Sequence, residues 1–166
     1  MDIHVYTTVM PYHHLPPRER PQLALPLSAP PSPRVIAYCD GGSRGNPGPS
    51  GYGVRFEYDN GAVEEFSGAI GVATNNVAEY RGLIALLEKA NERHIENLLV
   101  RSDAMLVVQQ MRRVWKVREP HLVGLHNQAR ALAGRIKSIR YEHVPREHNT
   151  HADRLANDAM DLELRP

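Results

Sequence analysis

The order of apolar and polar positions predicts alternating strands and helices over residues 34–162. Short apolar runs between polar or turn residues are typical of strands, and Asp59, Asn60 and Gly61 between two such runs form a hairpin-turn signal. Apolar residues at helical spacing, such as Leu83 and Leu87, indicate a helix with one face in the core. The expected strands are 35–40, 52–58, 62–69, 97–102 and 139–144, and the expected helices are 76–92, one from Asp103, 121–136 and one from about 151.

This order predicts an α/β fold with a mixed five-stranded sheet flanked by helices. The first three strands are close enough in sequence to form an antiparallel meander, whereas the later strands alternate with helices. A chain of 166 residues suits one domain with a normal core. We assign that domain to residues 34–162 and a short C-terminal tail to 163–166.

Residues 1–33 have a different composition. They hold eight of the 13 prolines and show neither helical nor alternating periodicity. Such a stretch buries too little apolar surface to offset the entropy of ordering, so we expect a disordered, proline-rich N-terminal arm. It also lacks the basic start and compact apolar region of a secretory signal.

Charge and cysteine content narrow the class of protein. The net charge of +1 excludes a general polyanion-binding surface, so any grip on nucleic acid must be local. The densest basic stretch is Arg112, Arg113, Lys116 and Arg118 around Trp115, which is either a phosphate-binding stripe or a solvated helix end and loop. A single cysteine, Cys39, excludes an internal disulfide and favours a reducing compartment. No apolar run approaches membrane-spanning length, so we expect a soluble, cytoplasmic protein that does not contact membranes.

Four carboxylates stand at element boundaries. Asp40 and Asp103 each end a buried strand, where open α/β sheets place their ligands if the strands are parallel neighbours. Glu79 lies on the apolar stripe of its helix, where an ionised carboxylate requires a cation, a metal or hydrogen bonds. Asp153 opens the last helix. Taken singly, each has a simpler interpretation as a turn or capping residue, with Asn76 and Thr150 as the capping-box partners of the two helix acids.

The glycine-rich segment 41–53 admits two interpretations. Pro47 and Pro49 obstruct the helix that would follow a nucleotide-binding loop, and no Gly-Lys-Ser/Thr is present. We therefore favour a turn whose glycines let the backbone approach the phosphates or sugars of another chain. The alternative is a purely structural hairpin.

The motifs that carry these residues resemble those of the type 1 ribonuclease H family. DGGSRGNPGPSGYG, TNNVAEYRGLI, RSDAMLVVQQM and HVPREHNTHADRLANDAMD follow the family's order over about residues 34–162. The motifs are most similar to those of the compact bacterial and archaeal branch. Other members carry a long, lysine-rich helical insertion, the basic handle, and the corresponding segment here is only RRVWKVREP. The resemblance implies the ribonuclease H-like fold and an endonuclease that cleaves the RNA strand of RNA/DNA hybrids, leaving 5′-phosphate and 3′-hydroxyl ends.

The same resemblance implies the roles of individual residues. Two Mg²⁺ ions, for which Mn²⁺ could substitute, would be held by the four acids, with Asp40 bridging both ions, Asp153 on the nucleophile side, and Glu79 and Asp103 on the leaving-group side. An oxygen-only ligand set suits such hard cations. His148, in the loop before the last helix, is the candidate for proton transfer, although a solvated loop histidine is the simpler interpretation. The expected substrate-binding residues are Gly41, Asn46, Thr74, Asn75 and Asn76, the asparagines as readers of 2′-hydroxyls or as helix caps.

Alternatives remain open at this stage. Double-stranded RNA is a second candidate substrate, and we expect a monomer. The same fold could serve a non-catalytic nucleic-acid-binding module or another nuclease of the ribonuclease H-like superfamily. The intact set of four acids argues against the first, and the TNNVAEY helix start argues against the second.

Overall fold

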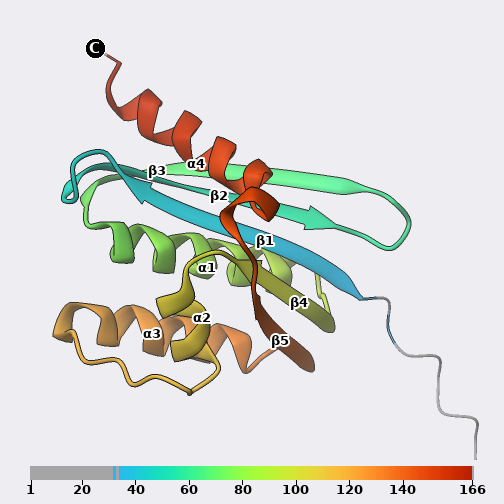
Figure 1. The fold of residues 1–166 in the computed structure, drawn as a ribbon. Helices are drawn as coiled ribbons and strands as arrows, with labels where there is room; N and C mark the ends of the chain where they lie inside the picture. Colours follow the sequence, from blue (N-terminus) through green and yellow to red (C-terminus); the bar gives the residue numbers. More distant parts are fainter. Residues whose placement is uncertain (1–31, 33, 166) are drawn as a thin grey trace, which may run out of the picture. The chain divides into compact units, whose positions relative to one another are not determined.

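The computed structural model describes residues 32 and 34–165 (Figure 1). All but Ser32 of the expected N-terminal arm therefore lies outside the described residues. The elements in chain order are β1 (Val35–Ser43), β2 (Gly48–Glu57), β3 (Val63–Ala73), α1 (Asn75–Glu92), β4 (Asn97–Ser102), α2 (Met105–Met111), α3 (Pro120–Ala133), β5 (Ser138–His143), the 3-10 turn η1 (Arg146–His148) and α4 (Thr150–Glu163).

The five strands form one mixed sheet in the order β3-β2-β1-β4-β5. Strands β1, β2 and β3 pair antiparallel as a meander, whereas β4 pairs parallel with both β1 and β5. Helix α4 packs on β1, β2 and β3, and α1 packs on β1 and β2 on the other face with α3 beside it (Figure 1). The predicted α/β architecture with a mixed five-stranded sheet is confirmed.

The core lies between the sheet and α1. Its largest fully buried side chains include Tyr80, Phe56 and Leu87. The Tyr80 hydroxyl donates to Gln110 Oε1 at 2.5 Å, and Gln110 Nε2 donates to the Lys116 carbonyl, which fixes α2 and the loop after it to α1. Among the described helices, none has the length and apolar character needed to span a membrane.

The glycine-rich segment differs from the prediction. Strands β1 and β2 run through most of it, and the turn shrinks to 44–47. A Cβ on Gly41 would overlap the Ala78 carbonyl of α1, and a Cβ on Gly53 would overlap the Ala152 carbonyl of α4. These glycines therefore let the two helices lie directly on the strands. At Gly41 and Gly53 helix packing is by itself enough to require glycine, and the approach of another chain to Gly41 stays a prediction.

We expect Gly53→Ala to destabilise the protein by about 1–3 kcal/mol or more, because the methyl group must push α4 off the sheet. Gly124→Ala is the matched control, since Gly124 lies in α3 with open space where its Cβ would be. That change should raise stability by about 0.5–1 kcal/mol through helix propensity. Chemical denaturation of the two variants measures both effects. A Gly53→Ala protein as stable as wild type would contradict the packing argument.

Candidate active site

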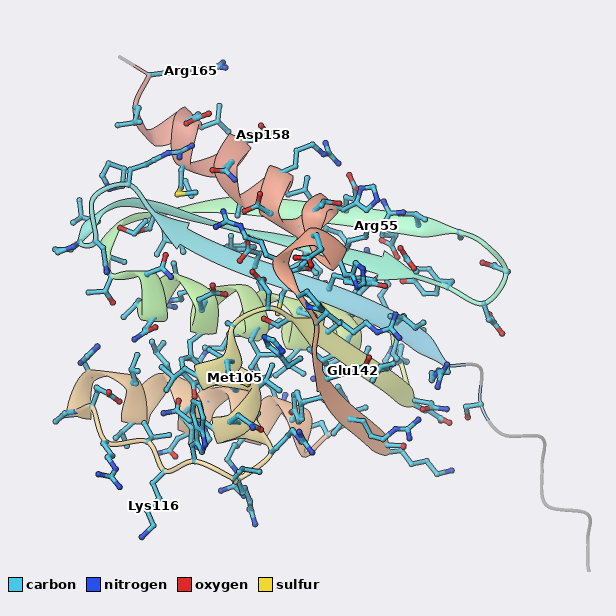
Figure 2. All side chains as sticks on the ribbon, viewed as in Figure 1. Arg55, Met105, Lys116, Glu142, Asp158 and Arg165 are labelled. Carbon is cyan, nitrogen blue, oxygen red and sulfur yellow. The ribbon has the colours of Figure 1, made fainter. Side chains whose placement is uncertain are left out.

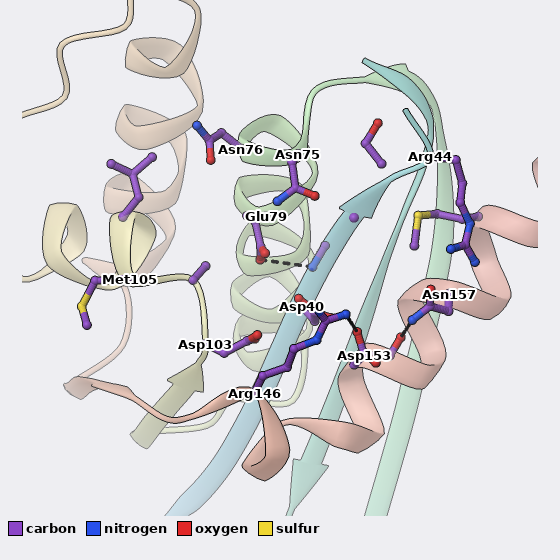
Figure 3. Close-up of a pocket in the computed structure, with 16 residues that line it drawn as sticks. Asp40, Arg44, Asn75, Asn76, Glu79, Asp103, Met105, Arg146, Asp153 and Asn157 are labelled. Atoms are coloured by element: carbon purple, nitrogen blue, oxygen red, sulfur yellow. Dashed lines mark hydrogen bonds and ion pairs between the residues drawn. The ribbon is translucent and has the colours of Figure 1, made fainter. Parts of the chain in front are cut away.

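Four elements bring the four predicted acids to one end of the sheet. Asp40 lies in β1 and Asp103 directly follows β4, so the parallel register that pairs Tyr38 with Arg101 sets the two acids side by side. Glu79 comes from α1 and Asp153 from the first turn of α4. All four line one hollow of about 420 Å³, which we call the carboxylate pocket (Figure 3).

Burial and repulsion from the neighbouring acids make Asp40 and Glu79 reluctant to ionise. Asp40 is 7% exposed and Glu79 is 8% exposed. Burial, followed by the charges of Asp103 and Asp153, raises the pKa of Asp40 to about 7. Burial, followed by the charges of Asp40 and Asp103, also raises the pKa of Glu79 well above its usual value. The Gly41 N–H donates to Glu79 Oε2 at 3.1 Å and opposes these shifts only in part.

The capping interpretations of the two helix acids are wrong. Thr74 is the N-cap of α1, and its hydroxyl accepts from the Val77 N–H at 3.3 Å. Asn149 is the N-cap of α4, where no side chain makes a capping hydrogen bond. Glu79 and Asp153 are therefore free to point into the pocket.

The donor set fits a hard divalent cation. The acidic groups that line the pocket offer only carboxylate oxygens, which are the ligands that hard cations prefer. No imidazole or thiol, which softer metals prefer, is among the described lining residues. Within the described part of the chain, no three His, Cys, Asp or Glu side chains are already arranged to hold an ion together. Asp153 is ion-paired with Arg146 at 3.1 Å. Cys39 is buried, and burial raises the pKa of its thiol, so it is no competing nucleophile.

Two residues in the site were missed by the sequence reasoning. Arg146, from η1, reaches across the pocket to Asp153 (Figure 3). Asn149 is 1% exposed, and its Nδ2 donates to Asp103 Oδ1 at 2.6 Å and to the Cys39 carbonyl at 2.9 Å. The backbone carbonyl of Asn149 accepts a hydrogen bond from the Asp153 N–H. Asn149 thus joins the three chain segments that carry Asp40, Asp103 and Asp153; its place four residues before Asp153 was the signal available in the sequence.

The predicted substrate-binding residues divide into two groups. Gly41, Asn75 and Asn76 line the carboxylate pocket, with both asparagines on the first turn of α1 above Glu79 (Figure 3). Asn46 and Thr74 are not among its lining residues. The Asn46 side chain accepts from the Asn75 N–H at 2.9 Å, so it fixes the β1–β2 turn to the start of α1.

His148 and part of the basic stretch line hollows other than the carboxylate pocket. His148 lines a different hollow, with Tyr38 and His151, so its role in proton transfer stays a prediction. Trp115, Lys116 and Arg118 line a neighbouring hollow of about 440 Å³ that shares Leu106 with the carboxylate pocket. In this loop between α2 and α3, Trp115 is 46% exposed and Lys116 extends away from the ribbon (Figure 2). The basic stretch therefore borders the site.

Comparison with known proteins identifies similar chains. A family profile described as "Reverse transcriptase-like" matches residues 38–159. A bifunctional protein of Mycobacterium tuberculosis is 55% identical over 130 residues, 77% of this chain and 36% of that protein, so this chain spans just over a third of that relative. The solved N-terminal RNase H domain of a Mycobacterium tuberculosis protein, fused to maltose binding protein, is 52% identical with a TM-score of 0.77, covering 80% of this chain and 97% of that one. LC11-RNase H1, solved in complex with an RNA/DNA hybrid, is 39% identical with a TM-score of 0.74, covering 79% and 99%.

We expect the metal-free protein to lose stability as the pH rises from about 4 to about 7. Folding raises the pKa of Asp40 to about 7 from its ordinary value near 3.8, so the folded state holds this proton more tightly and is favoured below the lower value. Asp40→Asn removes that titration and should flatten the profile and raise the melting temperature above pH 7. Thermal melts in chelator between pH 4.5 and 8 measure the difference. Parallel profiles for the two proteins would refute the assignment.

We expect Asn149→Ala to weaken binding of Mg²⁺ or Mn²⁺ as well as stability, because Asp103 loses its fixed partner. The loss of stability should be about 1–3 kcal/mol for buried hydrogen-bond partners left unpaired. Asn91→Ala is the control, because the Asn91 Nδ2 likewise donates two hydrogen bonds. Its acceptors are the backbone carbonyls of Leu87 and Leu132, remote from the acids. Calorimetric titration with Mn²⁺ separates the two variants. Equal metal affinity in both would limit Asn149 to a structural role.

Proposed function

The chain belongs to the type 1 ribonuclease H family, and on that premise we propose that it is a metal-dependent endonuclease that hydrolyses the RNA strand of RNA/DNA hybrids. The observation that carries the proposal is the convergence of Asp40, Glu79, Asp103 and Asp153 on one pocket from four separate elements. A noncatalytic binding module would gain nothing from Asp40 and Glu79, whose burial and neighbouring charges raise their pKa values. LC11-RNase H1 was solved with an RNA/DNA hybrid bound, which supports the same substrate class here.

The four acids Asp40, Glu79, Asp103 and Asp153 would together hold two Mg²⁺ ions. When bound, such ions lower the pKa of an attacking water and neutralise charge on the leaving oxygen. The chain's own residues hold the acids in place. The Gly41 N–H orients Glu79, and Asn149 orients Asp103. Arg146 forms an ion pair with Asp153. This ion pair would have to break for Asp153 to bind a metal ion instead.

Selection of RNA would come from the start of α1. RNA-containing duplexes display 2′-hydroxyls in a wide, shallow minor groove. Asn75 and Asn76 line the pocket beside the acids, and neither side chain makes a capping hydrogen bond in the described structure, because Thr74 is the cap. Their carboxamides are therefore available to donate to and accept from a 2′-hydroxyl. We also propose that the protein is a monomer and acts in the cytoplasm. The elution volume of the full chain in gel filtration tests the monomeric state.

The decisive experiment is cleavage of matched RNA/DNA, RNA/RNA and DNA/DNA duplexes with Mg²⁺, with Mn²⁺ and with chelator. We expect hybrid cleavage only with metal, 5′-phosphate and 3′-hydroxyl products, and at least about 1000-fold loss in Asp103→Asn, because the acids act as one unit. Circular dichroism confirms that the variant is folded. Hybrid cleavage that survives chelator, or is unchanged in Asp103→Asn, would refute the proposal.

Two further variants in the same assay test the assigned helpers. Asn76→Ala should reduce hybrid cleavage without changing affinity for DNA/DNA duplexes, and equal losses on both would point to a damaged helix start. His148→Ala should lower turnover by about 10- to 100-fold if this histidine transfers a proton. Unchanged turnover from pH 6 to 9 would remove His148 from the mechanism.

A further inference from the structure

Arg44 is a second cation at the rim of the carboxylate pocket. Among the described lining residues, the pocket has four carboxylates and two cationic side chains, Arg44 and Arg146. The guanidinium of Arg146 is paired with Asp153. Arg44 instead comes from the β1–β2 turn and reaches alongside α4, on the side of the acids opposite Met105 (Figure 3). It is therefore placed to meet a strand that passes over the acids, away from the atoms that react.

The turn that carries Arg44 is rigidly connected to the site. The Arg44 N–H donates to the Pro49 carbonyl at 2.8 Å. A Cβ on Gly48 would overlap the Arg44 carbonyl, so the turn closes tightly around this residue. Asn46 in the same turn accepts from the Asn75 N–H at 2.9 Å. The turn thus fixes the backbone of Arg44 relative to Asn75. Strand β1 connects it to Asp40, four residues earlier.

The present partner of Arg44 is weakly held. Arg44 Nη2 lies 3.0 Å from Asp161 Oδ1, and the two side chains are 43% and 56% exposed. Exposed ion pairs of this kind contribute little to stability, so the guanidinium can accept a second anion or exchange its partner without a large penalty. Asp161 does not line the pocket, so it competes with a phosphate for the guanidinium from outside the pocket.

A nucleic-acid strand needs such a contact here. The net charge of +1 provides no general attraction for a phosphate backbone, so binding depends on local cations. A planar guanidinium binds phosphate oxygens through two parallel hydrogen bonds, which an ammonium group cannot match. We propose that Arg44 binds a backbone phosphate of the strand in the carboxylate pocket, away from the scissile one, by exchanging its exposed partner Asp161 for the phosphate. This inference rests on the proposed function and adds a specific anchor to it.

The test compares Arg44→Ala with Arg93→Ala, which removes the same charge. Arg93 is similarly exposed, at 39%, and is paired with Glu64 at 2.9 Å, but it caps the opposite end of α1 from Asn75. Steady-state cleavage of a hybrid in Mg²⁺ gives kcat and KM over a series of KCl concentrations. Arg44→Ala should raise KM about 5- to 20-fold at low salt, with a slope of log KM against log salt that is flatter by about one. Its kcat should stay within about twofold of wild type because the contact is remote from the reacting atoms.

Two more variants separate a phosphate contact from a structural role. Arg44→Lys should recover part of the loss, because it keeps the charge without the planar fork. Asp161→Asn should bind hybrid as tightly as wild type or more tightly, since Arg44 loses a competing anion. The inference is overturned if Arg44→Ala matches Arg93→Ala, or if Asp161→Asn raises KM as much as Arg44→Ala. A wild-type protein that cleaves no hybrid overturns the proposed function itself, and this inference with it.

Discussion

Repulsion among four carboxylates at the end of an apolar sheet is the interaction on which the site depends. Asp40 and Glu79 are almost completely buried, and burial with their mutual charge raises both pKa values. Neither the hydrogen bond from Gly41 nor the one from Asn149 supplies the positive charge that would neutralise the cluster. The stability of the apolar core holds the acids together, and the unfavourable electrostatic energy is what favours binding of a cation.

Close backbone packing makes this arrangement geometrically feasible. Glycine at positions 41 and 53 allows α1 and α4 to contact the strands directly, from opposite faces of the sheet. Glu79 and Asp153 then reach the end of β1 from near the starts of their helices. Larger residues would move each helix outward and separate its acid from Asp40. The same glycines that a sequence motif attributes to substrate binding therefore serve first to set distances between carboxylates.

The charge distribution around the acids is asymmetric. Arg44 and Asn75 lie on the side of the β1–β2 turn, and Trp115 and Lys116 lie beyond Leu106 on the other side. A chain with a net charge of +1 can attract a polyanion only through such local groups. The contact of Arg146 with Asp153 adds a positive charge beside the acids. Arg44 and Lys116 are therefore among the local cations next to the acids.

The sequence alone was sufficient for the α/β class, the order of the strands and helices, and the four acids, because strand and helix periodicity and local motifs are properties of neighbouring residues. The sequence-based prediction ended β1 too early and began β2 too late. The glycine-rich segment between them looks like a loop when its contacts with α1 and α4 are unknown. The side chains of Asn46 and Thr74 fix the turn and the start of α1, which the sequence did not show, and their role with substrate stays a prediction. Asn149 and Arg146 acquired their roles only in the folded chain, because their partners Asp103, Cys39 and Asp153 meet through parallel pairing of β1 with β4 and docking of α4. Such contacts join residues up to 110 positions apart, and no local pattern encodes the direction in which a buried side chain points.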